Sequence, residues 1–246
     1  MKILVAISKA PDTTSKITFT DGDTKFNEAG VQFIINPYDE WYALVRGLEL
    51  KEANGGTVTT ITVGPAAADP IIRKALAIGA DDAVRIDAAP TDAFFVASQI
   101  AEYAKDKGYD LILTGKETVD YNGSQVGGLV AGLLDLPYLP NTSKLDVAGT
   151  TATVERDVQG GEEILEAQLP IVLSAAKGMA EQRIPNMRGI MAARSKKLEV
   201  VPAVEVAALT EILDYTLPEA KSAVKLIDPE NAGELIALLH SEAKVI

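Results

Sequence analysis

The residues with the clearest chemistry lie in a polar loop between two apolar segments. Residues 111–113 predict a strand buried on both faces, and Gly115 ends it. Residues 125–134 predict a helix that packs closely through its small residues, Gly127, Gly128, Ala131 and Gly132. The loop amides and the first helical N–H groups have no partners and attract negative charge. We interpret this loop as a nucleotide phosphate site, and the alternative is an ordinary βα turn whose glycines serve packing.

The side chains needed for most catalytic chemistry are missing from the sequence. There is no cysteine, and the single histidine, His240, lies on a predicted C-terminal helix where we expect it to be exposed. A transition-metal site and a Ser/His or Cys/His pair are therefore disfavoured. Asp120 is the best single carboxylate in the loop, and its expected role is to hydrogen-bond loop amides or a nucleotide. The sequence predicts a nucleotide-holding chain without catalytic residues, and neither GxGxxG nor GxxxxGK[ST] is present.

Composition excludes several other classes of protein. The 246 residues, 47% of them hydrophobic, can bury a full core. No apolar run approaches the roughly 18 residues that a membrane span needs. The net charge of −12 disfavours binding to DNA or RNA. The first residues predict a strand rather than a signal peptide, so we expect a cytoplasmic protein.

Strands and helices alternate along the first half of the chain. Strands are expected at residues 3–7, 58–63, 83–86 and 111–113, and helices at 69–78 and 91–107. This alternation predicts an α/β fold with a doubly wound, mostly parallel sheet, in which ligands bind at the carboxyl ends of strands. Ala6, Val63 and Gly115 lie at such ends.

A helix start at residues 36–40 is expected to face the same crevice. Asn36 is predicted to cap the helix, Pro37 to take the first helical position, and the acids that follow to complement the helix dipole. The helix is expected to end at residues 54–56, Asn-Gly-Gly. A small hairpin is predicted at residues 17–27, before this helix.

The pattern changes after Pro140. Residues 144–147, 151–158 and 164–169 alternate as antiparallel strands do, and residues 171–174 predict a strand that rejoins the main sheet. An exposed loop is expected at 177–188, a short helix at 189–197, an irregular arm at 198–218 and a final helix at 229–244. We expect a nucleotide-binding domain at 1–198, with the antiparallel segment 144–169 and a recognition loop at 177–194, and a C-terminal arm and helix at 199–246 that pack on a partner subunit.

The chain resembles the beta subunit of electron transfer flavoproteins over nearly its whole length. The matching segments, in order, are LVAISKAPD, INPYDEWYALVRGLELKE, VGPA with ALAIGADDAVRI, LILTGKETVDYNGSQVG, VERDVQGG and RIPNMRGIMAARSKK. The resemblance implies a Rossmann-like fold of the adenine nucleotide alpha hydrolase type. It also implies an alpha subunit that shares one FAD with this chain, and a structural AMP within this chain's own fold. Acyl-CoA or other dehydrogenases would reduce the flavin, which would pass electrons to a downstream acceptor.

The resemblance also implies a set of site residues. The AMP pocket would consist of Ala6, Asn36, Pro37, Tyr38, Asp39, Val63, Gly115, Lys116, Glu117, Thr118, Val119, Asp120, Tyr121, Asn122, Gly123, Ser124, Gln125 and Val126. Gly123 is expected to have a positive φ. Arg156 and Asp157 would lie near the flavin and the subunit contact. Met187 would be the apolar anchor of a partner-recognition loop. Thr13 falls where some members carry an aromatic residue near the flavin ring, and it is given no role.

Three alternatives to this hypothesis remain open. Some relatives are electron-bifurcating and hold a second FAD in place of AMP, and the loop DYNGSQVGG shares QVG with their version. The segment NPY followed by Asp39 and Glu40 favours AMP instead. A nucleotide-binding stress or signalling protein, from a different class, would be a ligand sensor and would not need residues 144–194. A flavin- or nucleotide-dependent enzyme acting alone is the third alternative.

Overall fold

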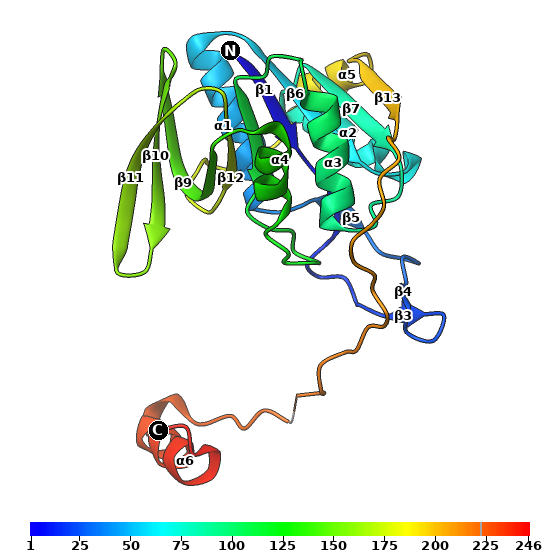
Figure 1. Cartoon of the computed structure of the whole chain (residues 1–246). Helices are drawn as coiled ribbons and strands as arrows, with labels where there is room; N and C mark the ends of the chain where they lie inside the picture. Colours follow the sequence, from blue (N-terminus) through cyan, green and yellow to red (C-terminus); the bar gives the residue numbers. More distant parts are fainter. Residues whose placement is uncertain (222) are drawn as a thin grey trace.

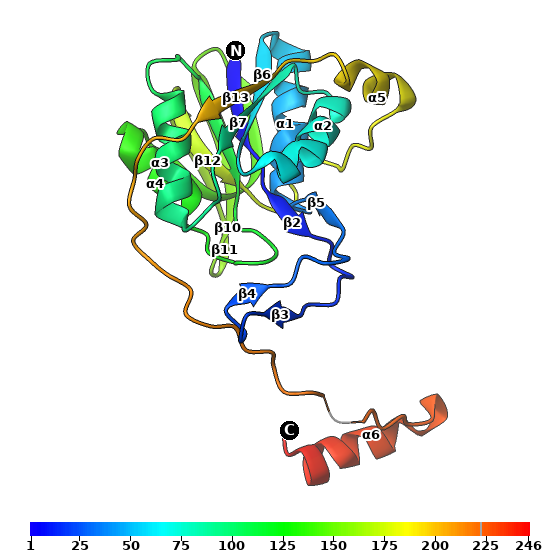
Figure 2. The same ribbon diagram turned by 90° about the vertical axis from the view of Figure 1, so that its right-hand side faces the viewer.

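The computed structural model describes residues 1–221 and 223–246. A central sheet of nine strands has the order β11-β10-β9-β12-β8-β1-β6-β7-β13, and helices cover both of its faces (Figures 1 and 2). Its strands are β1 (Lys2–Ala6), β6 (Thr57–Val63), β7 (Asp82–Asp87), β8 (Leu111–Gly115), β9 (Tyr138–Ala148), β10 (Thr151–Val158), β11 (Gly161–Gln168), β12 (Ile171–Ala175) and β13 (Leu198–Pro202).

The two faces of the sheet bury separate apolar cores. Helices α1 (Asp39–Asn54), α2 (Asp69–Ile78) and α5 (Met187–Ala193) pack on one face, and α3 (Ala93–Ala104) and α4 (Val126–Leu134) on the other. Alternate side chains of β1 divide between them, because successive residues of a strand point to opposite faces. Ile3 and Val5 join Leu44 of α1 in the first core, whereas Leu4 joins Ile100 of α3 in the second.

The strand pairing confirms the predicted doubly wound α/β fold. Strand β1 is parallel to β6 and β8, β8 to β12, and β6 to β7. As predicted, β12 rejoins the sheet. The antiparallel strands β9, β10 and β11 extend this same sheet at one edge, because β9 is parallel to β12 and antiparallel to β10.

The irregular arm expected from residue 198 begins instead with a strand. Residues Leu198–Pro202 form β13, which pairs in parallel with β7 as the last strand of the sheet, so the expected boundary at 199 lies inside it. An edge strand has only one neighbour, and its half-exposed side chains lack a clear apolar pattern. The arm then leaves the domain toward the 3-10 turn η2 (Pro229–Asn231), helix α6 (Ala232–Leu238) and the π-helical turn η3 (Leu239–Ala243), which lie apart from it in Figure 1.

A small hairpin is one of the parts of the domain that contact the arm. Strands β3 (Phe19–Thr20) and β4 (Lys25–Phe26) form the predicted hairpin, and β2 (Lys9–Pro11) pairs with β5 (Phe33–Ile35) nearby. The ring of Tyr215 in the arm stacks on Phe19 with the ring centroids 4.7 Å apart. No helix in the described part of the chain is long and apolar enough to cross a membrane.

Candidate nucleotide site

The three strand ends predicted to line the site share one edge of the sheet. Strand β1 lies between β6 and β8, and all three run in the same direction. Ala6, Val63 and Gly115 are the last residues of these strands. Their carboxyl ends therefore lie side by side, at the crevice position where ligands usually bind in such a sheet.

Asn36 lies at this crevice, but it does not cap the helix. Helix α1 begins after Tyr38, whose φ is 65°, and Pro37 lies before the helix rather than in its first turn. The buried Asn36 side chain instead donates through Nδ2 to the Glu117 carbonyl oxygen at 2.9 Å and accepts from the Val119 N–H at 2.8 Å. Asn36 therefore holds the loop at residues 116–125, the candidate nucleotide loop, instead of capping the helix. The sequence pattern is typical of a helix start and does not indicate this role.

The loop itself carries charges that are mostly paired with one another. Lys116 forms an ion pair of 2.9 Å with Glu117, and the Glu117 N–H donates to the Asp39 carboxylate at 3.3 Å. Burial raises the pKa of Asp39 above its ordinary value. Asp120 accepts a hydrogen bond from the Tyr121 N–H at 3.0 Å, the loop-amide role expected for it.

The end of the loop places backbone N–H groups at the start of α4. Asn122 and Ser124 have left-handed φ values of 48° and 51°, and Gln125 returns to the right-handed region. A left-handed residue followed by a right-handed one directs successive N–H groups toward one concavity, a common anion site. No side chain caps α4. The positive φ predicted for Gly123 was wrong, because Asn and Ser carry the left-handed turn on either side of it.

Gly115, which ends β8, and Gly127, one of the predicted packing glycines, are both needed where elements meet. A Cβ atom on Gly115 would lie 2.7 Å from Glu40 Cγ, and one on Gly127 would lie 2.7 Å from Thr114 Oγ1. Gly128 meets Tyr138 less closely. Gly132 faces open space, so its predicted packing role was wrong. Helices α1 and α4 can thus approach β8 only because these two positions lack side chains.

Glu40 is the site residue that sequence reasoning underestimated. It was expected to act only on the helix dipole, but its side chain is buried and accepts hydrogen bonds from the Ser8 N–H at 2.7 Å and the Ser8 Oγ at 2.9 Å. Burial raises its pKa to about 8, against the opposing effect of Ser8, and Asp120 and Asp39 add to the increase. Its spacing to the buried Leu44 and Gly47 on one face of α1 is a signal that could have revealed it.

The Arg156–Asp157 pair lies away from the nucleotide loop. Arg156, Thr142, Ala175 and Gly115 are successive Cα partners across β10, β9, β12 and β8. Three strand spacings separate Arg156 from Gly115, about 14 Å. Arg156 Nε donates to the Glu163 carboxylate at 2.7 Å on the neighbouring strand, and Asp157 is exposed. The structure therefore separates the predicted flavin side from the predicted AMP pocket.

Met187 is the first residue of α5 rather than the tip of a loop. The helix spans Met187–Ala193, two residues earlier at its start than expected, and Asn186 caps it by accepting from the Gly189 N–H at 2.9 Å. Met187 remains 73% exposed. A Cβ on Gly189 would lie 2.2 Å from the Ala77 carbonyl oxygen, so α5 packs tightly on α2. Thr13 and His240 are both exposed.

A groove lies between α2 and α5, and Met187, at the start of α5, is not among its lining residues. The volume of the groove is about 540 Å³, and it is lined by Pro70, Arg73, Lys74, Ala77, Pro185, Ile190, Ala193 and Arg194. Arg73 donates to the carbonyl oxygens of Ala193 and Lys196 at 2.8 and 2.7 Å, which fixes the end of α5. Helix α5, which begins with the exposed Met187, is thus held on α2, and basic side chains line the groove between the two helices.

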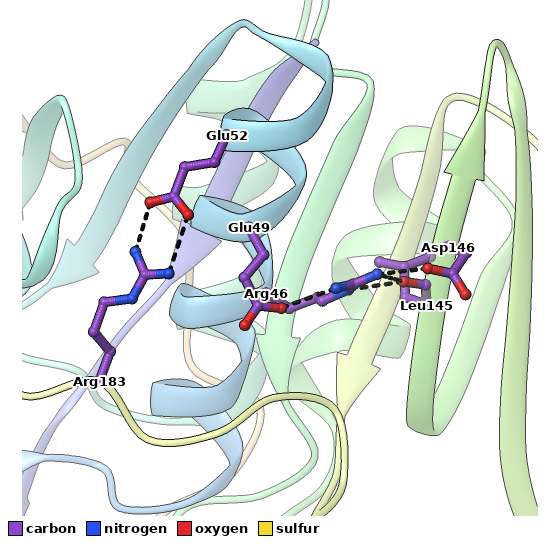
Figure 3. Close-up of polar contacts among 6 residues, drawn as sticks. All are labelled: Arg46, Glu49, Glu52, Leu145, Asp146 and Arg183. Atoms are coloured by element: carbon purple, nitrogen blue, oxygen red, sulfur yellow. Dashed lines mark hydrogen bonds and ion pairs between the residues drawn. The ribbon is translucent and has the colours of Figure 1, made fainter.

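Polar side chains of α1 contact both the β9–β10 hairpin and the segment before α5 (Figure 3). Arg46 donates to the Leu145 carbonyl oxygen and forms ion pairs with Glu49 on its own helix and with Asp146 on β9, at 2.8 and 2.7 Å. Further along the helix, Glu52 forms a two-point ion pair with Arg183, in the segment before α5. The same helix therefore contacts the antiparallel hairpin and the Met187 region.

Comparison with known proteins agrees with this architecture. A family model described as the electron transfer flavoprotein domain matches residues 23–206, more than half of the chain. The electron transfer flavoprotein subunit beta of Bacillus subtilis (strain 168) is 38% identical over 260 aligned positions that cover both chains completely. That of Syntrophomonas wolfei is 36% identical and covers 94% of this chain and 91% of its own. Protein FixA of Azotobacter vinelandii is 35% identical over 81% of this chain and 74% of its own.

The chain belongs to the electron transfer flavoprotein family, as a beta subunit. Its function accordingly lies in electron transfer, and a subunit of this type has an alpha subunit as its partner.

Proposed function

We propose that this chain holds a structural AMP and, together with an alpha subunit, seats the one FAD of a heterodimeric electron carrier. The observation that supports AMP most strongly is the convergence of Asn36, the end of β8 and the uncapped start of α4 at one crevice. Asn36 was expected from one part of the sequence, and the end of β8 and the start of α4 from another. In this proposal the chain is a carrier subunit in the cytoplasm without catalytic residues of its own.

The donors and acceptors of the crevice suit a nucleoside monophosphate. The amides around Ser124, Gln125 and Val126 suit the phosphate, because they combine a concave turn with a helix N-terminus. The carboxylates of Asp39 and Asp120 suit the hydroxyl and amino donors of adenosine.

The flavin side would be formed by Arg156 and Asp157 on β10. Arg156 is held by Glu163 on β11 and lies in the same row of the sheet as Gly115. FAD, when bound between the subunits, supplies the redox chemistry. The role proposed for these two residues is to position it and to contact the alpha subunit.

Met187 is proposed to dock a dehydrogenase, for example an acyl-CoA dehydrogenase. An exposed apolar side chain can fill a small pocket on a partner and so act as an anchor. The groove between α2 and α5 carries Arg73, Lys74 and Arg194, which would attract an acidic partner despite the net charge of −12. A shuttle must also leave for its acceptor, so the contact should be weak.

The bifurcating version, with a second FAD in place of AMP, is the second candidate. The amides at the start of α4 could bind the phosphate of either ligand, so they do not distinguish the two versions. Only the QVG segment at residues 125–127 favours the second FAD. Membership of this family favours an electron carrier over the signalling protein and the independent enzyme.

The heterodimer and its flavin are tested by light scattering and a visible spectrum of the complex purified from its native source. The C-terminal arm and helix expose large apolar residues, among them Leu213, Val224, Leu226 and Ile236, which a partner would cover. We expect a complex larger than 26.0 kDa with a flavin absorbance. A colourless monomer, or a monomer carrying its own flavin, would contradict the proposal.

A further inference from the structure

Glu40 is a buried carboxyl group beside the proposed AMP site. Its side chain is at the start of α1, where its Cγ is in contact with the Gly115 backbone at the end of β8. The hydrogen bonds to it come from Ser8, which follows β1, through the N–H at 2.7 Å and Oγ at 2.9 and 3.0 Å. The carboxyl thus joins three of the elements that form the crevice.

Two acidic groups add to the raised pKa of Glu40. They are Asp39, from the same turn of α1, and Asp120, from the nucleotide loop. The nearest cation of the loop, Lys116, is paired with Glu117. Ser8 contributes hydrogen bonds but no positive charge, and the backbone of Gly115 contributes no charge at all. A buried carboxylate without a cation and with two like charges favours its protonated form.

We propose that Glu40 holds a proton when nucleotide binds, so that binding of AMP is coupled to proton uptake at this carboxyl. The inference rests on the proposed AMP site and names a residue outside the set expected from the sequence. Its physical basis is charge, because a phosphate bound at the start of α4 adds a dianion to a crevice that already holds two carboxylates. The added charge strengthens the preference of Glu40 for the neutral form.

The direction of the resulting pH dependence follows from linkage. Glu40 has a pKa of about 8 in the chain without nucleotide, and the phosphate raises this pKa further. The complex then binds more protons than the free protein between the two pKa values, so AMP affinity falls as the pH rises through that window. An increase of about one unit gives an affinity about fivefold lower at about pH 9 than at about pH 7.

Other groups of the crevice keep their charge in this range. The hydrogen bond to Glu117 raises the pKa of Lys116 above its ordinary value. Partial burial, with Tyr215 and Asp120 beside it, raises the pKa of Tyr121 to about 12. The second ionisation of the phosphate, near pH 6, is complete before the window begins.

The test is calorimetric titration of the nucleotide-depleted heterodimer with AMP, in buffers of different ionisation enthalpy. We expect an uptake of about half a proton per AMP near pH 8.5, and the fivefold loss of affinity between about pH 7 and pH 9. In the Glu40→Gln variant both effects should disappear, because glutamine does not titrate. The local structure should persist, because glutamine can still accept from the Ser8 N–H and donate to Ser8 Oγ. The matched control is Glu102→Gln on the exposed face of α3, which should retain both.

Each outcome decides the matter. AMP binding without proton uptake in the unaltered protein would overturn the inference and leave the AMP site intact. Undiminished proton uptake in Glu40→Gln would assign the proton to another group and also overturn it. If this variant does not assemble, the proton uptake measured for the unaltered protein still shows whether AMP binding is coupled to a proton. An unaltered protein that binds no AMP would overturn the proposed function, and the inference with it.

Discussion

The side-chain oxygen of Asn36 accepts a hydrogen bond from the Val119 N–H at 2.8 Å, across 83 residues of chain. The same amide donates to the Glu117 carbonyl oxygen at 2.9 Å. One buried side chain thereby holds both the start and the middle of the nucleotide loop. The position of the loop depends on a residue that approaches it from the neighbouring helix start.

Replacement of Asn36 by Ala should weaken both the fold and the retention of AMP. The Val119 N–H and Glu117 carbonyl lose their partner, and an unpaired buried polar group costs about 1–3 kcal/mol. Denaturant unfolding measures the free energy of unfolding, and mass spectrometry measures the nucleotide. Asn231→Ala, at an exposed position before α6, is the control and should change neither. Full AMP content in Asn36→Ala would show that the hydrogen bonds of Asn36 to the loop are dispensable.

Gly115→Ala should disturb the site more than Gly123→Ala. An added methyl group at 115 meets Glu40 Cγ at 2.7 Å and the Glu40 backbone nitrogen at 3.1 Å, so α1 must shift. Overpacking of this kind costs about 1–3 kcal/mol. At 123 nothing lies within 4 Å and the φ is not positive. Thermal unfolding of both variants checks the difference, and equal melting temperatures would show that the close approach of α1 to β8 is unimportant.

Met187→Ala should weaken docking of the dehydrogenase without affecting flavin content. Loss of an anchor side chain costs about 1–2 kcal/mol, or roughly a 5- to 30-fold loss of affinity. The measurement is the rate of flavin reduction by a cognate dehydrogenase at several concentrations of the variant, beside its absorbance spectrum. Leu133→Ala, an exposed apolar residue on α4, is the control. Unchanged kinetics would exclude the anchor, and loss of flavin would make Met187 a packing residue.

Asp92 should fasten the arm to the domain in a pH-dependent way. Its carboxylate accepts from the Phe95 N–H at 2.7 Å and from the Leu209 and Thr210 N–H groups at 2.6 and 3.0 Å. These bonds, the one from Phe95 first, lower the pKa of Asp92. A lowered pKa means that the stabilising effect is complete above the ordinary Asp value and is lost as the pH falls through the lower folded one.

Hydrogen exchange of the two arm amides tests this role of Asp92. In Asp92→Asn, exchange at Leu209 and Thr210 should be roughly 3- to 10-fold faster at neutral pH. The change is modest because hydrogen bonds to an exposed carboxylate stabilise the arm only weakly. The unaltered protein should approach the same rates only in acid. The exposed arm residue Asp214, replaced by Asn, provides the comparison and should have no effect. Equal protection in all three proteins would mean that the arm is held elsewhere.

The core of the fold could be predicted because its signals are local. The apolar runs of β1, β6 and β8 and the small residues after them specify buried parallel strands and their turns. Strand β13 could not be predicted in this way, since it depends on pairing with β7, which precedes it by more than a hundred residues. Its own sequence, LEVVP, suits an edge strand or an extended arm equally well.

The site was harder to predict than the fold for a related reason. The pattern Asn-Pro followed by acids is typical of a helix start, yet the long-range bonds of Asn36 to the loop outweigh local capping. Glu40 was misjudged because an acid in a first turn is usually exposed, whereas here Ser8 and Gly115 surround it. Both residues have roles that appear only when distant segments are brought together.

The most direct test of the account is the nucleotide content of the complex purified with its native partner. The complex is denatured, and the released nucleotides are identified and counted by mass spectrometry and absorbance. We predict one FAD and one AMP per heterodimer, with AMP lost from the Asn36→Ala variant. Two FAD molecules and no AMP would contradict the proposed AMP site and assign the protein to the bifurcating type.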